Sequence, residues 1–252
     1  MDGTPIVDIL MFHSISDAAG PTAIPVEIFK AQMRAIAESG LPVITMDALV
    51  DARRMGKPLP PRSIVITFDD GFQDFADTAF PVLQSHDFPV LVFLTTEYIG
   101  RQEGWDGANK PERDIMDWET VRDLASQGVA FGSHSVTHSD LTMLSDDTLG
   151  IEINVSKAEI EDQLQQPVYH FAPPYGLTND HVTAAASGVY RTLATTRLGQ
   201  VGPADHLHGL PRLEMFYFTN LTRWREHLAG TGTAYLRRRK MLRWVRERLP
   251  AI

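Results

Sequence analysis

Two short segments of the chain carry side chains that can bind a metal ion and move a proton. Residues 67–71 hold the adjacent carboxylates Asp69 and Asp70 directly after an apolar run. Residues 134–138 begin and end with an imidazole and also follow an apolar run. Two imidazoles and one carboxylate form a common catalytic metal set that leaves positions open for water and substrate. The remaining carboxylate can then take a proton from an attacking water, and this combination indicates a hydrolase.

Each segment alone has an ordinary structural explanation. An Asp-Asp-Gly sequence after a strand often caps a helix, and two histidines four residues apart are a weak metal signal. Together they are more informative, because burying adjacent carboxylates without partners would be costly. Two of the three residues between His134 and His138 are β-branched, which disfavours a helix and favours a turn that directs both imidazoles to one centre.

Composition and charge restrict the class of protein. The chain has 252 residues, of which 43% are hydrophobic and 22% charged, as in an ordinary globular protein. The net charge of -9 argues against nucleic acid as a partner, and the absence of cysteine excludes disulfides and thiolate metal sites. No apolar run reaches the ~20 residues that span a bilayer. Residues 1–5 lack the basic start of a signal peptide, so we expect a cytoplasmic protein.

Short apolar runs alternate with helical patterns along most of the chain. Alternation with short connections predicts parallel strands joined by right-handed crossovers. About seven such units favour a single-domain, TIM-like, distorted (β/α) barrel, whose active site would lie at the carboxyl ends of the strands. We expect strands at 7–12, 42–45, 63–68, 90–94, 129–132, 168–171, 191–195 and 213–216, and helices at 26–39, 72–85, 117–127 and after Ser145.

Two segments are expected to lie outside the regular barrel pattern. Residues 101–114 are polar and hold two glycines and a proline, which predicts an excursion over the barrel mouth, where Trp105 could stack on a sugar. Residues 1–230 would form the barrel and residues 231–252 a basic amphipathic helix. Its predicted apolar side consists of Tyr235, Met241, Leu242, Val245 and Leu249. Such a helix can dock on the barrel, which we favour, or rest on an anionic membrane surface.

The chain resembles the polysaccharide deacetylases of the NodB-homology group, a carbohydrate esterase family. The resemblance extends from residue 11 to about residue 212 and rests on three motifs. They read Thr-Phe-Asp-Asp-Gly at 67–71, His-Ser-Val-Thr-His at 134–138 and Phe-Ala-Pro-Pro-Tyr-Gly at 171–176. The resemblance implies a distorted (β/α) barrel and a metal-dependent N- or O-deacetylase.

The resemblance also implies roles for individual residues. Asp69 would be the general base, and the backbone N–H of Tyr175 would help to hold the oxyanion. The metal ligands would be Asp70, His134 and His138. Proline at 173 and 174 stiffens the turn that would aim the Tyr175 donor, so Pro174 is expected beside the substrate. Zinc is the default ion, although such ligands also accept cobalt, nickel or iron.

The chain departs from the family pattern around the general base. Ala172 stands where many members carry an arginine that braces the base, so the bracing must differ or be absent. The late Leu-x-His motif that supplies the general acid has no clean counterpart, and of three alternatives we favour His208. The other two alternatives are His206 and His227. His13 follows the first predicted strand, which places it at the mouth, where it would bind substrate or position Asp69.

The function favoured by these residues is hydrolysis of an N-acetyl or O-acetyl group on a sugar. The sugar could belong to a polysaccharide, an oligosaccharide or a lipid-linked glycan precursor. Two alternatives stay open: a non-catalytic protein that binds metal and carbohydrate, and a hydrolase of cyclic amides on the same fold. A glycosidase is disfavoured because its two carboxylates lie about 5–10 Å apart across the bond, which sequence neighbours rarely do. The sequence indicates no oligomeric state.

Overall fold

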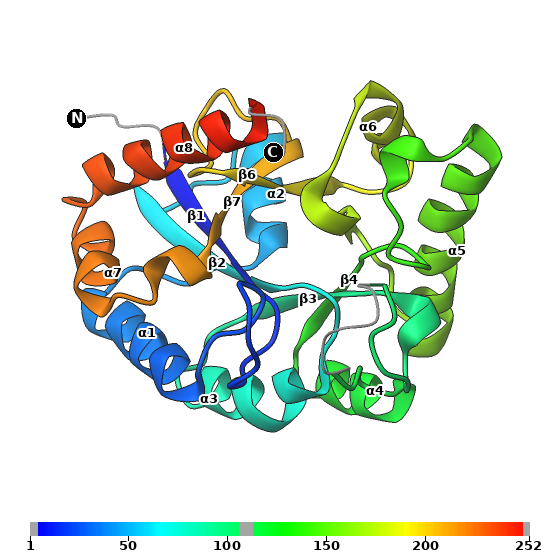
Figure 1. Ribbon diagram of the computed structural model, residues 1–252, viewed down its shortest axis with the longest axis horizontal. Helices are drawn as coiled ribbons and strands as arrows, with labels where there is room; N and C mark the ends of the chain where they lie inside the picture. Colours follow the sequence, from blue (N-terminus) through cyan, green and yellow to red (C-terminus); the bar gives the residue numbers. More distant parts are fainter. Residues whose placement is uncertain (1–4, 106–112, 249–252) are drawn as a thin grey trace.

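Seven parallel strands close into a barrel within residues 5–105 and 113–248, the parts of the chain that the computed structural model describes (Figure 1). The ring closes because β1 pairs with β2 on one side and with β7 on the other. The strands are β1 (Ile6–Phe12), β2 (Arg62–Phe68), β3 (Val90–Leu94), β4 (Ala130–Ser133), β5 (His170–Phe171), β6 (Thr192–Leu198) and β7 (His208–Glu214). The predicted TIM-like barrel is therefore confirmed.

Helices surround the barrel and connect its strands (Figure 1). Where they begin and end follows from local chemistry, since the side chains of Asp117 and Ser145 accept hydrogen bonds from backbone N–H groups one turn on. Gly40 ends α1 in the left-handed conformation that suits glycine. The α-helices are α1 (Val26–Ser39), α2 (Met46–Met55), α3 (Phe80–Gln84), α4 (Trp118–Ser126), α5 (Asp146–Leu164), α6 (Asp180–Ser187), α7 (Leu221–Leu228) and α8 (Thr233–Arg248).

Three predicted elements differ from the structure. The expected strand at 42–45 is reduced to a single bridge between Val43 and Ile64. The expected helix at 72–85 is divided into a π-helical stretch, Phe75–Ala79, and the short α3; Pro81, in the first turn of α3, has no N–H to donate. The expected strand at 213–216 is wrong in its bounds, because β7 occupies 208–214 and a 3-10 turn follows it.

Helix α8 packs on the barrel, but only in part through the side that the sequence suggested. Leu236 is buried, and the Tyr235 hydroxyl donates to the carbonyl oxygen of Tyr217 over 2.6 Å. The predicted apolar side is wrong in part, because three of its members face solvent: Met241, Leu242 and Val245. Leu249 lies outside the described residues. Docking therefore uses Tyr235 of the predicted side together with Leu236, which lies outside it.

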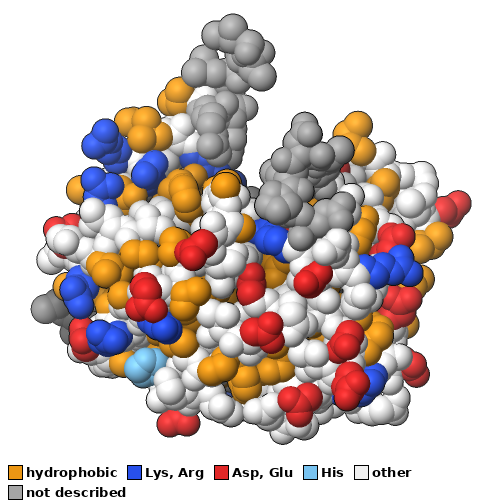
Figure 2. Space-filling view, turned by 60° about the horizontal axis from the view of Figure 1, so that its bottom comes forward, with side chains coloured by type: hydrophobic (Ala, Val, Ile, Leu, Met, Phe, Trp, Pro, Cys, Tyr) orange, Lys and Arg blue, Asp and Glu red, His pale blue; other side chains and the backbone are white. Residues whose placement is uncertain are grey.

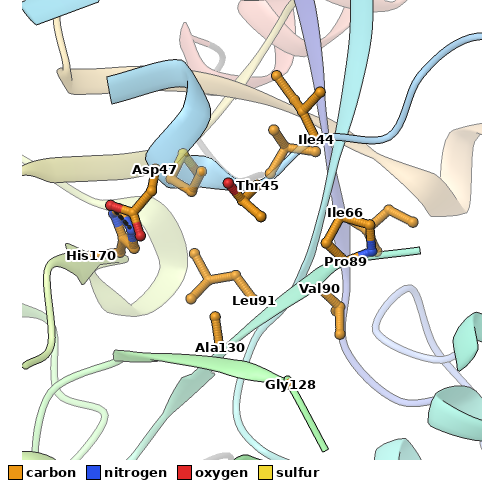
Figure 3. Close-up of a pocket in the computed structure, with 12 residues that line it drawn as sticks. Ile44, Thr45, Asp47, Ile66, Pro89, Val90, Leu91, Gly128, Ala130 and His170 are labelled. Carbon is orange, nitrogen blue, oxygen red and sulfur yellow. Dashed lines mark ion pairs between the residues drawn. The ribbon is translucent and has the colours of Figure 1, made fainter. Parts of the chain in front are cut away.

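The amino-terminal end of the barrel contains a small cavity. Its volume is about 100 Å³, and it lies between the start of α2 and the first residues of β3, β4 and β5 (Figure 3). His170 and Asp47 face one another at its edge, with Nε2 and Oδ1 3.5 Å apart. The His170 Nδ1 atom is already hydrogen-bonded to the Thr192 hydroxyl over 2.9 Å. The predicted functional residues of the motif segments lie at the opposite end, where the strands finish.

Candidate active site

The two motif segments meet at the carboxyl ends of β2 and β4, the strands on either side of β3. Asp69 and Asp70 directly follow β2, and His134 directly follows β4. The Asp69 N–H donates to the carbonyl oxygen of Phe12, the last residue of β1, over 2.9 Å. Asp70 has a φ of 75°, in the left-handed region, so the chain turns sharply there. This turn directs the two adjacent carboxylates to different partners.

Asp70, His134 and His138 form a group that could hold a metal ion. The Oδ1 atom of Asp70 lies 3.4 Å from Nε2 of His134 and 3.3 Å from Nε2 of His138. One ligand atom from each residue lies within 4.8 Å of the other two, and all three side chains are buried. His134 bonds through Nδ1 to the carbonyl oxygen of Ala172 over 2.6 Å, which leaves Nε2 facing the group. The predicted trio is therefore brought together.

The chemistry of this donor set fits a divalent metal. Among the described residues, neither Asp70 Oδ1 nor His138 Nδ1 has a hydrogen-bond partner, although both atoms are buried. A buried carboxylate oxygen without a donor is costly, and a cation between the carboxylate and the imidazoles would satisfy it. Two nitrogens and one oxygen are the ligands of many zinc, cobalt, nickel and iron sites.

The titration of the trio reflects its mutual contacts. Burial would raise the pKa of Asp70, but the two imidazoles outweigh it and hold that pKa well below its ordinary value. Burial would lower the pKa of His134, but Asp70 and Asp69 outweigh it and raise that pKa. For His138 burial prevails, and the pKa is lowered. Asp70 is thus ionised, as a metal ligand must be.

Asp69 is braced by an arginine that the sequence reasoning missed. Arg212, in β7, donates from Nη1 to Oδ1 over 2.6 Å and from Nη2 to Oδ2 over 2.7 Å. Arg212 is itself fully buried, and its Nε donates to the carbonyl oxygen of Thr195. Bracing is therefore present, but it comes from β7 and not from the position of Ala172. The available signal was a single arginine inside the apolar stretch at 210–213.

This ion pair keeps Asp69 ionised in a buried position. Burial would raise the pKa of Asp69, but the Arg212 guanidinium and His134 outweigh it and lower the pKa below its ordinary value. Asp69 is not part of the metal group, and both of its oxygens face Arg212. A bidentate guanidinium also fixes the orientation of the carboxylate. The result is a rigid, charged acceptor beside the metal group.

His13 lies at the mouth, as its place after β1 predicts. Its Nε2 atom lies 3.9 Å from Oδ2 of Asp69, and its side chain is 14% exposed. Glu214, at the end of β7 and paired in register with Met11, is a further charged residue of the mouth that the sequence reasoning missed. Burial raises the pKa of Glu214, although the charges of His13 and Arg212 oppose the shift.

The third motif borders the metal group. The Tyr175 ring lies 4.8 Å from the His138 ring, centroid to centroid, and Pro174 beside it is buried. Tyr175 has a φ of 59°, and its carbonyl oxygen accepts from the Thr196 hydroxyl over 3.1 Å. A side chain at Gly176 would collide with Thr196 at 2.3 Å, so only glycine fits there. The Tyr175 turn is thus held closely against β6.

Trp105 also lies at the mouth, within the described part of the predicted excursion. Its indole is stacked on the His138 ring, with centroids 4.4 Å apart and planes 27° apart. Tyr98 and Phe72 contact it as well. One face of the indole therefore supports a ligand of the proposed metal, and only the remaining surface can meet a sugar. Residues 106–112 of the excursion lie outside the described residues.

His208 does not fit the role of general acid that the sequence suggested. It is the first residue of β7, so it lies at the amino-terminal end of the barrel, opposite Asp69. Its Nε2 atom is hydrogen-bonded to the carbonyl oxygen of Tyr190 over 3.0 Å. His227 is buried against Asp8, near the start of β1, and His206 is exposed in the loop before β7. None of the three alternatives lies at the mouth.

A barrel whose mouth holds an ionised base beside a group of potential metal ligands is the arrangement expected of a hydrolase. The family model described as "Polysaccharide deacetylase" matches residues 56–192, more than half of the chain. The chain belongs to this family, and its relatives indicate a hydrolase that acts on C–N bonds other than peptide bonds. The match ends before β7 and so does not include Arg212.

Individual relatives agree with this assignment. The chain is 24% identical to YxkH of Bacillus subtilis strain 168 over 208 residues, which are 82% of this chain and 70% of that protein. It is 27% identical to the poly-beta-1,6-N-acetyl-D-glucosamine N-deacetylase of Escherichia coli K12 over 136 residues, but these span only 20% of that protein.

Solved structures share the fold. The deacetylase PplD of Streptococcus pyogenes, in complex with acetate, matches with a TM-score of 0.72 and 23% identity over 83% of this chain and 92% of that one. IcaB from Ammonifex degensii matches with a TM-score of 0.77 and 21% identity over 90% of this chain and 97% of that one. In the described part of the chain, no helix has the length and apolar character needed to cross a membrane.

Proposed function

We propose that the protein hydrolyses the N-acetyl group of an N-acetylhexosamine in a glycan, with a divalent metal held by Asp70, His134 and His138. The observation that carries this proposal is the pairing of a buried, donor-free carboxylate oxygen with two imidazole nitrogens, beside a second carboxylate that remains ionised. We propose zinc as the ion, because two nitrogens and one oxygen are a common catalytic zinc set. When bound, the ion would polarise the acetyl carbonyl and lower the pKa of a water.

Asp69 is the proposed general base. Arg212 holds its carboxylate ionised and in one orientation, so it can accept a proton from the attacking water. The backbone N–H of Tyr175 is the proposed donor to the oxyanion, because the Tyr175 turn is held rigidly against β6 and borders His138. Pro174 and the accessible edge of Trp105 would contact the sugar.

His13 replaces His208 as the proposed proton donor. It is the imidazole of the mouth that remains after the metal group is formed, and it lies beside the base. Amide hydrolysis forms a C–O bond and breaks the C–N bond, and the leaving nitrogen must gain a proton before it departs as an amine. His13 can supply that proton, while the proton from water passes to Asp69. The products are acetate and the free amino sugar.

The deciding experiment is acetate release from oligomers of N-acetylglucosamine with β-1,6 or β-1,4 linkages. We expect the purified protein to release acetate, a chelator to abolish the release, and zinc to restore it. Binding of metal and glycan without acetate release would favour a non-catalytic protein, and hydrolysis of allantoin in place of the glycan would favour a cyclic amide hydrolase. The comparison of the two linkages also tests whether the substrate resembles that named for the Escherichia coli relative.

We also propose that α8 contacts an anionic membrane surface. Two basic side chains of this helix point towards the barrel and not towards solvent: Arg239 lies over the Tyr217 ring, and Arg243 donates to the Thr196 hydroxyl. The outward side carries Arg238, Met241, Leu242 and Val245, which are all exposed and follow the i, i+3, i+4, i+7 spacing of one helix face. Basic side chains gather beside hydrophobic ones at the upper left of Figure 2, where α8 lies, whereas acidic ones dominate the middle and lower right.

Vesicle sedimentation tests this contact. We expect the protein to bind vesicles that contain phosphatidylglycerol but not pure phosphatidylcholine, and the double substitution Met241→Ser and Leu242→Ser to weaken that binding. Ile151→Ser on α5 is the matched control, because Ile151 is an exposed apolar residue on a helix without a basic cluster. Equal binding by both variants would exclude α8 as the contact surface.

A further inference from the structure

The loop that carries His13 is tied to the segment that carries the metal and base carboxylates. Asp74 lies four residues after Asp70, and its carboxylate reaches across to the two residues that follow His13. Its Oδ2 accepts from the Ser14 hydroxyl over 2.5 Å, and its Oδ1 accepts from the Ile15 backbone N–H over 3.0 Å. Because one carboxylate accepts hydrogen bonds from two consecutive residues, both the position and the rotation of the backbone next to His13 are restricted.

No other part of the mouth mechanism uses Asp74. It is not in the metal group, and its two carboxylate oxygens are occupied by Ser14 and Ile15. Burial raises its pKa, although the bonds from Ser14 and Ile15 oppose the shift. An uncharged amide of the same shape could keep both contacts, with its oxygen accepting from the Ile15 N–H and its NH2 group donating to the Ser14 hydroxyl oxygen. Asp74 therefore acts through hydrogen-bond geometry and not through its charge.

Backbone hydrogen bonds hold the loop after His13 to the chain that returns from it at residues 22–24. The Ser14 N–H donates to the carbonyl oxygen of Thr22, and the Ile24 N–H donates to the carbonyl oxygen of Ser14, each over 3.0 Å. These bonds fix Ser14 to the returning chain but do not connect it to the segment that bears Asp69. The Asp69 N–H bond to the Phe12 carbonyl oxygen holds the residue before His13, and Asp74 connects the two residues after it to the segment that bears Asp69. The 3.9 Å separation between His13 Nε2 and Asp69 Oδ2 is therefore set from both sides of His13.

We infer that Asp74 is a positioning residue that holds the His13 imidazole beside Asp69 through Ser14 and Ile15. This inference rests on the proposed role of His13 as proton donor. A displaced imidazole would fail to protonate the leaving nitrogen, while water attack and oxyanion binding would proceed unchanged. The defect would thus appear only with substrates whose leaving group needs a proton.

The test compares two substrates and three variants. An N-acetylglucosamine oligomer has an amine leaving group that must be protonated, whereas 4-nitrophenyl acetate has a leaving group that departs without a proton. We expect Asp74→Ala to lower kcat for the oligomer about 10–100-fold, with KM unchanged, and to change 4-nitrophenyl acetate hydrolysis less than about threefold. Asp74→Asn should retain most of the activity. Asp77→Ala is the matched control, because Asp77 lies in the same segment and its carboxylate accepts from Gln73 and not from the His13 loop among the described residues.

A double variant and a spectroscopic measurement complete the test. Adding Asp74→Ala to His13→Ala should cause no further loss, because both substitutions remove the same function. The NMR signals of the His13 ring should broaden or double in Asp74→Ala, while those of exposed His181 stay unchanged, whether or not a glycan substrate is found. Equal loss on both substrates, an additive double variant or an unchanged His13 signal would overturn the inference. Absence of acetate release by the wild-type protein would instead contradict the proposed function.

Discussion

The two ends of the barrel hold buried carboxylates in opposite circumstances. At the amino-terminal end, Asp8 Oδ2 accepts a hydrogen bond from Arg62 and lies 3.1 Å from His227 Nε2. Asp8 Oδ1 accepts a hydrogen bond from Gln200. At the mouth, Asp70 Oδ1 lies near two imidazole nitrogens but has no hydrogen-bond donor among the described residues. A carboxylate with partners on both oxygens stabilises a fold, whereas one with a donor-free oxygen beside two imidazoles at the ends of strands indicates a ligand.

The arginines that bind carboxylates at the two ends of the barrel, Arg62 and Arg212, differ in the same way. Arg62 is bound to Asp8 and to the carbonyl oxygen of Leu228, which joins β2 to α7 far from the mouth. Arg212 is bound in a bidentate manner to Asp69, in the fully buried position beside the metal group. One arginine thus connects elements of the fold, and the other prepares a base for proton transfer. Substitutions at the two ends should therefore separate stability from activity.

The largest expected effect concerns the mouth. Asp69→Asn removes the proposed base but retains the shape of the side chain, so kcat for acetate release should fall by about 10²–10⁴-fold. Metal content, measured by atomic absorption, should stay at that of the wild type because Asp69 is not in the metal group. Retained turnover would exclude Asp69 as the base, and loss of metal would make it a ligand.

The next effect concerns the amino-terminal end. Asp8→Ala leaves the half-buried Arg62 and the buried His227 without their carboxylate, which should lower the free energy of unfolding by roughly 3–5 kcal/mol. Urea denaturation measures this change. The folded fraction should still release acetate with a kcat close to that of the wild type, because the partners of Asp8 in the described part of the chain are Arg62, Gln200 and His227, away from the mouth. A large fall in kcat at full folding would show that the two ends are coupled.

The smallest effect concerns acid stability. Burial would raise the pKa of Asp8, but His227 and Arg62 outweigh it and hold the pKa below its ordinary value of 3.8. A lowered folded-state pKa adds stability that is complete above pH 3.8 and is lost as the pH falls through the folded-state value. The unfolding free energy of Asp8→Asn should therefore depend less on pH below 3.8 than that of the wild type. Identical pH slopes would remove Asp8 from the account of acid unfolding.

Several elements could be read from the sequence because their signal is local. The run at 90–94 is β-branched and apolar, and β3 has these bounds; the caps at Asp117 and Ser145 are equally local. The meeting of the two motif segments at the mouth followed from a topological rule, since residues directly after parallel strands meet at one end of a barrel. His13 was placed at the mouth by the same rule. The choice of Asp70, His134 and His138 as the ligands, with Asp69 as the base, came instead from the resemblance to the polysaccharide deacetylases.

The features that could not be predicted from the sequence depend on β7. Gly209 and Pro211 interrupt its apolar pattern, so the strand was expected too late in the chain. Because the strand was misplaced, Arg212 was not recognised as a buried partner of Asp69. His208 was favoured because Leu207 and His208 resemble the family's Leu-x-His motif in composition, although His208 is the first residue of β7. A contact between residues 143 positions apart leaves no trace in the local sequence. Only the closure of β7 onto β1 brings this arginine to the base.

The most direct test of the central claim is a crystal structure of the protein grown with zinc, recorded at the zinc absorption edge. We predict one strong anomalous peak within about 2.0–2.2 Å of an oxygen of Asp70 and a nitrogen each of His134 and His138, with Asp69 still bound to Arg212. A mouth without an anomalous peak, or a zinc ion bound instead beside Asp47 and His170, would contradict the account.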